Sequence, residues 1–455
     1  MTDVDFQAVR SEFELTEAFG AEAQAEADRA VDRCAEGRAD RTDIPLVTID
    51  PPGSMDLDQA MHLAREGDGY LVHYAIADVA ALVTPGGQLD TETRRRGQTV
   101  YLPDGSVPLH PRSLSEGAGS LLPDQRRPAA LWQIRLDADG EVTSARVDRA
   151  FVRSTARLDY AGVQADADAG RLHPSIAALP DVGRLRAAWG RSRGAIDLRL
   201  PAQEAVRSDD GWRLRVEPRT QADGWNAQIS LLTGMCAAHI MLDGGVGLLR
   251  TLPPAPDDAV ADLRRGAAAL GLEWPATVGV GDFLDGLDVT TPHGLAAMAD
   301  AVTLLRGAGY APFDGAAPEQ PLHAGVGAPY AHVTAPLRRL ADRFSTEVCL
   351  ALCSGAKVPD WARSALSDMA EVMKATDALS GKVERACIDL TEAVVLAARV
   401  GETFDAVVMR GEQVFVEDPA VIAKCEGDPP EGQAVQVRLA TADPDTRKVS
   451  FAYPA

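Results

Sequence analysis

The sequence predicts an α+β domain, with a mixed sheet and packed helices, followed by a small C-terminal all-β barrel of the OB type. Three observations predict this fold. Strand-like runs dominate residues 44–151, amphipathic helical stretches dominate residues 226–399, and short alternating strand runs return in residues 400–455. The length of 455 residues also favours more than one core, because single cores rarely grow beyond roughly 250–300 residues.

Residues 1–42 are expected to form a short helical N-terminal extension, because they are rich in Ala, Glu and Arg and poor in large apolar side chains. The first strand is predicted at residues 44–50, an apolar run that ends in Asp50. Turns with Gly and Asp separate the strands that follow. These are predicted at residues 59–63, 70–76, 129–136 and 142–151.

The middle of the chain is predicted to be helical, because apolar residues recur there at helical spacing. The predicted helices are residues 226–242, 256–270, 294–306, 334–353, 359–376 and 382–399. Because strands come first and helices later, residues 43–399 are expected to form one α+β domain.

The C-terminal residues 400–455 are expected to form the barrel. Val435, Val437 and Leu439 alternate with polar residues, as in a strand with one buried face, and Asp-Pro-Asp at residues 443–445 predicts a turn. The predicted strands are residues 403–409, 413–417, 434–440 and 449–453.

The composition is that of a globular protein without a membrane span. Apolar residues make up 46% of the chain and charged residues 25%. No apolar run approaches the ~18 residues of a spanning helix, and the acidic N-terminus has no apolar signal region. The six cysteines form no CxxC pair, which argues against a zinc ribbon or a redox motif. We therefore expect a reduced, cytoplasmic protein, and we expect a monomer.

The net charge of −22 argues against a simple nucleic-acid binder, which is normally basic. Only five of the 45 basic residues are lysines, however, and all the others are arginines. Arginine is the side chain that makes planar, bidentate contacts with phosphate. An acidic exterior with local arginines would therefore confine nucleic-acid binding to particular sites.

The sequence Asp50-Pro-Pro-Gly-Ser-Met-Asp-Leu-Asp58 gathers three carboxylates. Asp50 ends a strand, Pro-Pro-Gly predicts a turn, and Asp56 and Asp58 face the same side of extended backbone. Converging carboxylates repel one another unless cations such as Mg²⁺ or Mn²⁺ neutralise them. Such a cluster suits phosphoryl chemistry at two metal ions. Solvated turn aspartates, or the D-x-D site of a nucleotide-sugar transferase, remain alternatives.

The sequence YAHVTAPLRR opens the predicted helix at residues 334–353. Thr334 is expected to cap the helix, which places Arg338 and Arg339 in its first turn. Cations are unfavourable at that position unless an anion such as phosphate binds there. The structural alternative is an ion pair of Arg338 with Asp342 at i,i+4 spacing. Both interpretations hold if one arginine is paired and the other is free.

Together, these motifs resemble the catalytic domain of the ribonuclease II/ribonuclease R family. The matching segments occur in the family's order within residues 43–400. They are TIDPPGSMDLDQA, HYAIADVAALV, RRRGQTVYLPDGSVPLHPRSLSEGAGSLLP, FVRSTARLDY and YAHVTAPLRRLAD. The resemblance implies an RNB-type exoribonuclease domain at residues 43–399 and an OB-fold RNA-binding domain at residues 400–455.

The resemblance also implies an activity. Such enzymes are processive, hydrolytic 3′→5′ exoribonucleases that use Mg²⁺ or Mn²⁺, here two ions, and release nucleoside 5′-monophosphates from RNA. Asp50, Asp56 and Asp58 match three of the family's four metal-binding aspartates, and Arg338 matches the arginine that stabilises the reacting phosphate. Six further residues are expected to contact RNA, the first two as aromatic residues that stack on bases: Tyr101, Tyr160, Glu384, His332, Arg339 and Gln228.

The chain departs from the family in three places. Gln59 stands where the family has a fourth aspartate, so either one metal ion is held less firmly or water or another carboxylate replaces the ligand. Asp78 and Glu384 are candidate replacements, although we expect Asp78 to be structural. Gln228 lies where many relatives open a helix with two glutamates. Residues 1–42 are too short for the cold-shock domains that precede the catalytic domain in relatives.

These departures leave two questions open. The neutral Gln59 allows a second function, that of a catalytically weak RNA-binding protein of the same fold. The expected partner is the 3′ end of single-stranded RNA, and structured RNA as well if the lack of cold-shock domains widens the entrance. The basic triplet Arg94-Arg-Arg96 is expected to be a solvated face, with contact to the RNA backbone as the alternative.

Overall fold

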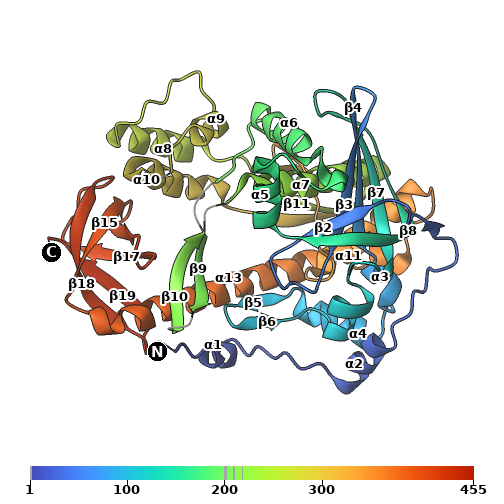
Figure 1. Ribbon diagram of the computed structural model, residues 1–455, viewed down its shortest axis with the longest axis horizontal. Coiled ribbons are helices and arrows are strands. Elements are labelled where there is room, and N and C mark those ends of the chain that lie inside the picture. Colours follow the sequence, from blue (N-terminus) through green and yellow to red (C-terminus); the bar gives the residue numbers. More distant parts are fainter. Residues whose placement is uncertain (1–2, 199–201, 209–210, 218, 290, 455) are drawn as a thin grey trace.

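A mixed six-stranded sheet lies at the centre of the larger part of the computed structural model, which describes residues 3–198, 202–208, 211–217, 219–289 and 291–454 (Figure 1). The strand order is β1-β8-β2-β3-β4-β7. The strands are β1 (Ala39–Asp40), β2 (Leu46–Ile49), β3 (Gln59–Glu66), β4 (Gly69–Ala77), β7 (Arg126–Leu136) and β8 (Val142–Leu158). The strands predicted in this region are confirmed.

The long strand β8 determines where the ends of β2 and β8 meet. It pairs antiparallel with β7 along most of its length and parallel with β2 near its end. In that parallel pairing Ile49 lies opposite Leu158. The residues that follow, Asp50 and Asp159, therefore leave the sheet side by side.

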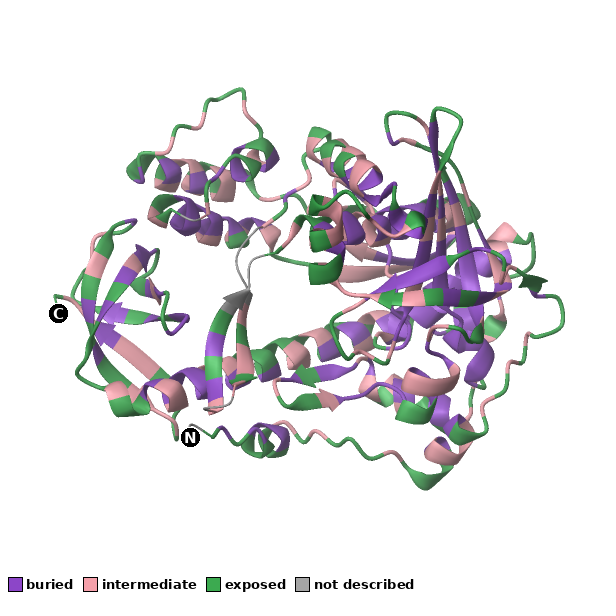
Figure 2. Ribbon diagram, in the orientation of Figure 1, coloured by how far each residue is buried: buried purple, intermediate pink, exposed green. Residues whose placement is uncertain are grey.

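Three long helices share one apolar core with this sheet, namely α7 (Gln221–Gly244), α11 (Leu340–Cys353) and α13 (Leu366–Leu396). Tyr74 and Trp132 are fully buried there. Figure 2 shows that buried residues concentrate in the sheet and on the sides of helices that face it. Removal of this apolar surface from water is the main stabilising contribution, at about 25 cal/mol per Å².

Small residues on α7 let a later loop approach the core. A Cβ atom on Gly234 would lie 2.1 Å from Cε2 of Tyr330, so no larger residue fits. The N–H of Ala331 donates a 3.1 Å hydrogen bond to the carbonyl oxygen of Gly234. The loop of residues 330–339 is thereby fixed against α7.

The helices of the C-terminal half differ from the prediction. The predicted helices at 359–376 and 382–399 are one helix, α13, preceded by the short α12 (Asp360–Arg363). Gly381 does not interrupt α13, because apolar residues before and after it, such as Met373 and Val383, are buried in cores.

A separate helical unit follows α7. It consists of α8 (Asp257–Ala269), α9 (Val280–Asp285) and α10 (Pro292–Asp300), and it has its own apolar core. The helix predicted to reach residue 306 leaves α-helical geometry after Asp300 and continues as a short 3₁₀ helix. The strand pairs that lie outside the prediction include β9 (Ala202–Ser208) with β10 (Gly211–Glu217), and β11 (Val246–Thr251) with β12 (Gly309–Asp314).

The C-terminal region is a closed five-stranded barrel, as predicted. Its strands are β15 (Thr403–Met409), β16 (Gln413–Val416), β17 (Val421–Glu426), β18 (Ala434–Asp443) and β19 (Lys448–Ala452). Of these, β17 was not predicted, although its inward residues alternate with outward ones. Phe404 and Phe451 stack edge to face in the barrel core, at 5.8 Å between ring centroids.

The N-terminal residues are less helical than predicted. In the described residues 3–42, only α1 (Gln7–Glu12) and α2 (Ala21–Asp28) are helices, and the chain between them runs extended along one side of the molecule (Figure 1). Apolar residues here, such as Phe6 and Val9, are buried against other elements. Among the described residues, no helix combines the length and the apolar character needed to cross a membrane.

Candidate active site

The loop between β2 and β3 carries the three predicted carboxylates. Asp50 follows β2, and its N–H donates to the carbonyl oxygen of Leu158 at 3.0 Å. Gly53 allows the turn that follows, with φ at +87°. Farther along, the N–H of Leu57 donates to Oγ of Ser120 at 3.0 Å. The loop is thus pinned at both ends, with Asp50, Asp56 and Asp58 close enough to influence one another's ionisation.

The three carboxyl groups are hard to ionise without a counter-charge. Burial raises the pKa of Asp50 to about 6, and the neighbouring Asp56 adds to the increase. Burial also raises the pKa of Asp56 and, most strongly, that of Asp58, which is 4% exposed. A cation placed among them would relieve this cost.

The carboxylate oxygens of Asp50, Asp56 and Asp58 are suitable ligands for a hard divalent cation. Carboxylate oxygens are the ligands that Mg²⁺ and Mn²⁺ prefer. Oδ2 of Asp50 is buried and has no hydrogen-bond partner among the described residues. In the described part of the chain, however, no three His, Cys, Asp or Glu side chains already stand in a metal-binding arrangement. The cluster therefore has suitable donors, but its side chains are not yet gathered around one point.

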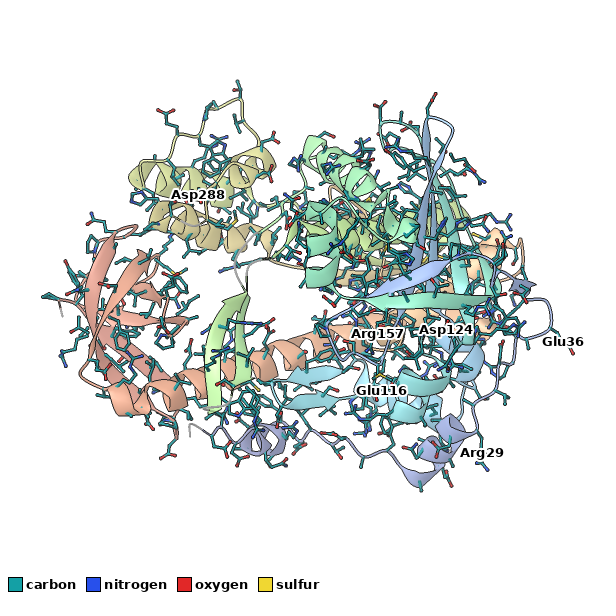
Figure 3. The ribbon with its side chains drawn as sticks, viewed as in Figure 1. Arg29, Glu36, Glu116, Asp124, Arg157 and Asp288 are labelled. Atoms are coloured by element: carbon teal, nitrogen blue, oxygen red, sulfur yellow. The ribbon has the colours of Figure 1, made fainter. Side chains whose placement is uncertain are left out.

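Two charged side chains that Figure 3 labels, Arg157 and Glu116, influence the ionisation of these carboxylates. Arg157 of β8 donates to the carbonyl oxygen of Ser54 at 2.9 Å, which braces the loop. Its charge also favours the ionised form of Asp50. Glu116 acts in the opposite direction, because it adds to the raised pKa of Asp56.

The arginine segment differs from the prediction. α11 begins at Leu340, so Arg338 and Arg339 lie in the turn before the helix and not in its first turn. The N–H groups of both arginines donate to the carbonyl oxygen of Ala335. Asp342 stabilises this turn, because its Oδ1 accepts a 2.7 Å hydrogen bond from the N–H of Ala335.

The two arginines have different roles. Arg339 forms a bidentate ion pair with the buried Asp342, at 2.5 and 2.8 Å, so the expected pair involves Arg339 and not Arg338. Arg338 is 46% exposed, and its Nε lies 3.7 Å from Oδ2 of Asp58. As predicted in outline, one arginine is held and the other is available to an anion.

Gln59 is fully engaged in hydrogen bonds. Its Oε1 accepts a 2.5 Å hydrogen bond from the hydroxyl of Tyr74, and its Nε2 donates at 2.7 Å to the carbonyl oxygen of Thr334. The Tyr74 hydroxyl also lies 2.8 Å from Oγ of Ser230 on α7. Gln59 therefore connects β3 and β4 to the arginine loop, and this use of its amide nitrogen requires a donor that aspartate lacks.

Two aromatic side chains flank the carboxylates. Tyr101 lies on β5 (Val100–Leu102), which forms a hairpin with β6 (Gly105–Val107), and it is 51% exposed. Shielding from water raises its pKa to about 12, with added contributions from Asp56 and Asp58. Tyr160 begins α5 (Tyr160–Asp168), and burial likewise raises its pKa to about 12, with Asp50 adding to the effect.

Asn226 is a site residue that the sequence analysis missed. Its Nδ2 donates to the hydroxyl of Tyr160 at 3.3 Å. The prediction named Gln228 instead, which lies two residues farther along α7 and thus on another side of the helix. The Asn226 position could be recognised only from the direction in which α7 faces Tyr160.

Other predicted residues lie away from the carboxylates. Nδ1 of His332 lies 2.7 Å from the hydroxyl of Tyr310, and burial together with nearby arginines lowers the pKa of His332 well below its usual range. Glu384 is exposed on α13, near Cys387. Asp78 is structural, as expected, because it caps α3 (Val79–Leu82) and pairs with arginines.

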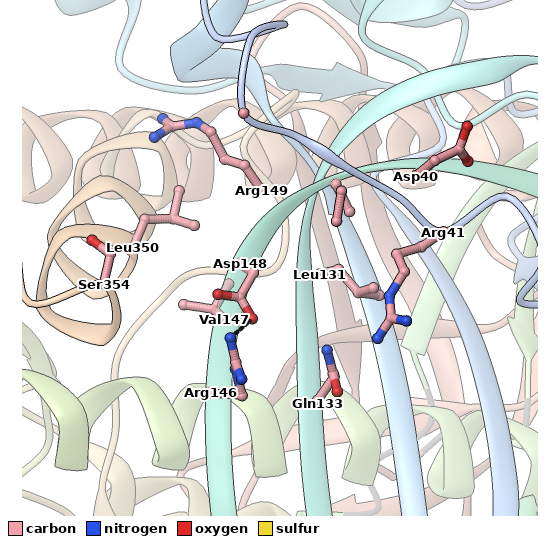
Figure 4. A pocket seen from close by; sticks show the side chains of 13 residues that line it. Asp40, Arg41, Leu131, Gln133, Arg146, Val147, Asp148, Arg149, Leu350 and Ser354 are labelled. Carbon is pink, nitrogen blue, oxygen red and sulfur yellow. Dashed lines mark ion pairs between the residues drawn. The ribbon is translucent and has the colours of Figure 1, made fainter.

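A pocket of about 550 Å³ lies elsewhere, between β7, β8, α11 and residues 37–41 (Figure 4). Three of its charged side chains, Arg146, Asp148 and Arg149, are already paired. Arg146 pairs with Asp148 at 2.6 Å, and Arg149 pairs with Glu347 at 2.6 Å. None of the three clustered carboxylates lines this pocket, so it is not part of the candidate site.

Comparison with known proteins places this geometry in a family. A family model described as the RNB domain matches residues 38–349, and one described as the RNase II-type exonuclease C-terminal S1 domain matches residues 402–453. Exoribonuclease 2 of Edwardsiella piscicida is 30% identical over 338 residues, which are 70% of this chain and 51% of that protein. Ribonuclease R of Escherichia coli (strain K12) is 30% identical over 321 residues, which are 67% of this chain and 39% of that protein.

The fold is also found among solved structures. The apo form of Mycoplasma genitalium RNase R superposes with a TM-score of 0.88 at 19% identity and covers 98% of this chain and 77% of that one. The same protein has been solved in complex with double-stranded RNA. The chain spans about half or less of the length of the two curated relatives named above.

Proposed function

The chain belongs to the RNB-domain family of ribonuclease II and ribonuclease R, and from this premise we propose that it is a processive, hydrolytic 3′→5′ exoribonuclease that releases nucleoside 5′-monophosphates. One observation carries the proposal. Three carboxylates that resist ionisation face the half-exposed guanidinium of Arg338. This arrangement offers a place for cations beside a place for a phosphate.

In this proposal Asp50, Asp56 and Asp58 hold the metal. Two Mg²⁺ or Mn²⁺ ions, when bound, would activate water and polarise the last phosphodiester. Arg338 stabilises the negative charge that develops on the phosphate oxygens. Tyr101 and Tyr160 stack on the terminal bases, at ~1–3 kcal/mol for each stacked base.

Four further residues stay predicted RNA contacts with different support. Arg339 is committed to Asp342 and His332 to Tyr310, so both would act on RNA mainly by shaping the arginine loop. Glu384 is exposed, so RNA can reach it, and Gln228 is partly buried on α7. The N–H of Asn226 already reaches Tyr160, and we add Asn226 to the residues that orient the terminal nucleotide.

The test uses uniformly labelled single-stranded RNA with Mg²⁺ or Mn²⁺, and with EDTA as the metal-free control. The wild-type protein is expected to release mononucleotides only with metal, and Asp58→Asn is expected to bind RNA without releasing them. Asp68→Asn, an exposed carboxylate in the turn between β3 and β4, is the matched control and should act as wild type. Normal hydrolysis by Asp58→Asn would contradict the site assignment.

A second function is favoured by one observation, the neutral Gln59 in the place of a fourth aspartate. If three carboxylates do not retain enough metal, the protein is a catalytically weak RNA-binding protein. A gel shift without mononucleotide release, at any Mg²⁺ or Mn²⁺ concentration, would support this function over the first.

The partner in the proposal is the 3′ end of single-stranded RNA. M. genitalium RNase R has been solved with double-stranded RNA, so a duplex with a 3′ overhang and a blunt duplex are the substrates to compare. All six cysteines are free thiols in the structure, which supports a reducing compartment such as the cytoplasm.

A further inference from the structure

A short N-terminal segment lies behind the hairpin that carries Tyr101. We call residues 4–15 the N-terminal strap. Phe6 is 1% exposed and Val9 is fully buried. They share one apolar core with three other parts of the chain, namely Val100, Leu102 and Val107 of the β5–β6 hairpin, Trp212 of β10, and Val383, Ala386, Cys387 and Leu390 of α13. The strap therefore packs on elements that are distant from it in sequence.

Ion pairs fix the strap at two points. Both terminal nitrogens of Arg10 donate to the carboxylate of Asp104, at 2.9 and 2.8 Å. Asp104 lies in the turn of the β5–β6 hairpin. Glu12 pairs with Arg447, at 2.6 Å, in the turn between β18 and β19 of the barrel. The strap therefore connects the tip of the hairpin to the barrel.

The residues after the strap are also held. Arg96, at the end of α4 (Gln88–Arg96), donates to the carbonyl oxygens of Thr16 and Ala18 at 3.0 and 2.6 Å. Its guanidinium lies 3.8 Å from the ring centroid of Phe19. Arg96, the last residue of the basic triplet at residues 94–96, therefore holds the N-terminal chain in place.

The hairpin has two sides with different surroundings. Val100 and Leu102 point into the core beneath the strap, so Tyr101, between them in the strand, points the other way. The charges of Asp56 and Asp58 reach the Tyr101 phenol on that side. Immediately before β5, at the open end of the hairpin, the N–H of Thr99 donates to the carbonyl oxygen of Arg338 at 2.9 Å. One end of the hairpin is therefore fixed by the arginine loop and the other by the strap.

We propose that the strap is a positioning element for Tyr101, with Arg10 and Asp104 as its positioning residues. This inference rests on the proposed function. By holding the tip of the hairpin, the Arg10–Asp104 pair fixes the aromatic ring at the distance from the carboxylates at which it stacks on the 3′-terminal bases. The barrel is attached to the same strap through the Glu12–Arg447 pair. The strap therefore fixes the position of the Tyr101 hairpin relative to the barrel.

The test uses single-stranded RNA with 2-aminopurine at its 3′ end, whose fluorescence falls when the base stacks. In EDTA, wild-type protein is expected to quench this probe. Arg10→Met and Asp104→Asn are expected to weaken quenching and to raise the dissociation constant about threefold to tenfold, a part of the full stacking contribution. With Mg²⁺, KM should rise by the same factor and kcat should stay within about twofold, since Tyr101 binds the substrate in the ground state as well as in the transition state.

Two controls separate positioning from simple stabilisation. Arg29→Met changes an exposed arginine after α2 whose side chain donates to the nearby Ala25 carbonyl oxygen, far from the hairpin (Figure 3), and it should act as wild type. In a Tyr101→Ala background, Arg10→Met should add nothing to the loss of RNA binding, because its effect passes through Tyr101. Arg10→Lys keeps the charge and should restore part of the quenching.

The outcomes are distinct. A wild-type protein that neither quenches the probe nor releases nucleotides overturns the proposed function and this role with it. A wild-type protein that quenches, with folded Arg10→Met and Asp104→Asn variants that quench equally well, overturns the role of the strap alone. An equal loss of binding in the Tyr101→Ala background also overturns it, because the strap would then act on the fold and not on Tyr101.

Discussion

Nε of Arg338 lies 3.7 Å from Oδ2 of Asp58, whose other oxygen accepts a 2.7 Å hydrogen bond from the N–H of Leu337. One buried carboxylate thus holds the backbone of the arginine loop and faces its guanidinium. The guanidinium remains 46% exposed, so its outer side is open to an anion. The relationship joins the two halves of the candidate site, the carboxylate loop after β2 and the loop before α11.

Substitution of the two adjacent arginines is expected to separate catalysis from stability. Arg338→Lys should lower kcat by about 10²–10³-fold, because a donor aimed at the developing phosphate charge is lost, and it should leave the unfolding temperature unchanged. Arg339→Lys should instead lower the free energy of unfolding by about 1–3 kcal/mol, because the bidentate bond to buried Asp342 is broken. Single-turnover kinetics and thermal unfolding check both, and a normal rate for Arg338→Lys would contradict its role.

Gln59→Asp is expected to improve metal binding and to weaken the metal-free protein. The substitution adds a fourth carboxylate but removes the donor to the Thr334 carbonyl oxygen. In EDTA the free energy of unfolding should fall by about 1–3 kcal/mol, the cost of an unsatisfied buried group. Added Mg²⁺ should restore it by mass action. Calorimetric titration with Mg²⁺ gives affinity and stoichiometry, with Gln133→Asp on β7 as the control for added charge. Unchanged metal binding would place position 59 outside the metal site.

In the metal-free protein, the contribution of Asp50 to stability is expected to be lost as pH rises through the range set by its pKa. Its folded-state pKa is about 6, above the ordinary 3.8, so between these values the folded state binds more protons than the unfolded state. The free energy of unfolding then falls with increasing pH, by up to ~3 kcal/mol for this group. Denaturant titrations in EDTA from pH 4 to pH 7 measure the slope, which Asp50→Asn should reduce. Equal slopes for the wild type and Asp50→Asn would show that the pKa of Asp50 is not raised in the folded state.

Tyr160 is expected to act through its ring more than through its hydroxyl. Tyr160→Phe removes only the bond from Asn226 and should raise the dissociation constant for RNA about twofold to fivefold, the worth of one modest hydrogen bond. Tyr160→Ala removes the stacking surface and should raise it by at least about fivefold. Fluorescence anisotropy in EDTA compares the two. Equal effects would mean that the hydroxyl, and not the ring, carries the contact.

Much of the fold followed from local sequence pattern. The strands β2, β3 and β4 and the barrel have strong alternation or apolar runs, and these were predicted. The β9–β10 hairpin was missed because its strands pack on α13 and not on the main sheet. α13 was predicted as two helices because Gly381 weakens the local pattern, whereas the packing that keeps it continuous comes from distant segments.

The site was predicted in its parts but not in its connections. The carboxylates Asp50, Asp56 and Asp58 and the half-exposed Arg338 follow from their motifs, and the structure places them near one another. Partner choice did not follow, because Asp342 lies at helical spacing from both Arg338 and Arg339. The bridge of Arg339 to Gln98, which accompanies the helix start at Leu340, is a tertiary contact that local sequence does not reveal. The contacts of Gln59 and Asn226 likewise depend on how α7 faces the sheet.

The helix α13 has a consequence for substrate length. Its 31 residues span about 46 Å at 1.5 Å per residue, with Met373 in the main core and Leu396 in the barrel core. The helix therefore sets a fixed distance between the barrel and the carboxylates. If the barrel and the carboxylates both bind RNA as proposed, an RNA that is shortened from its 3′ end keeps both attachments until it no longer spans this distance, and it then leaves the barrel in a single step. Processive degradation should therefore change abruptly to slow, distributive trimming at one chain length, which the geometry of this helix sets.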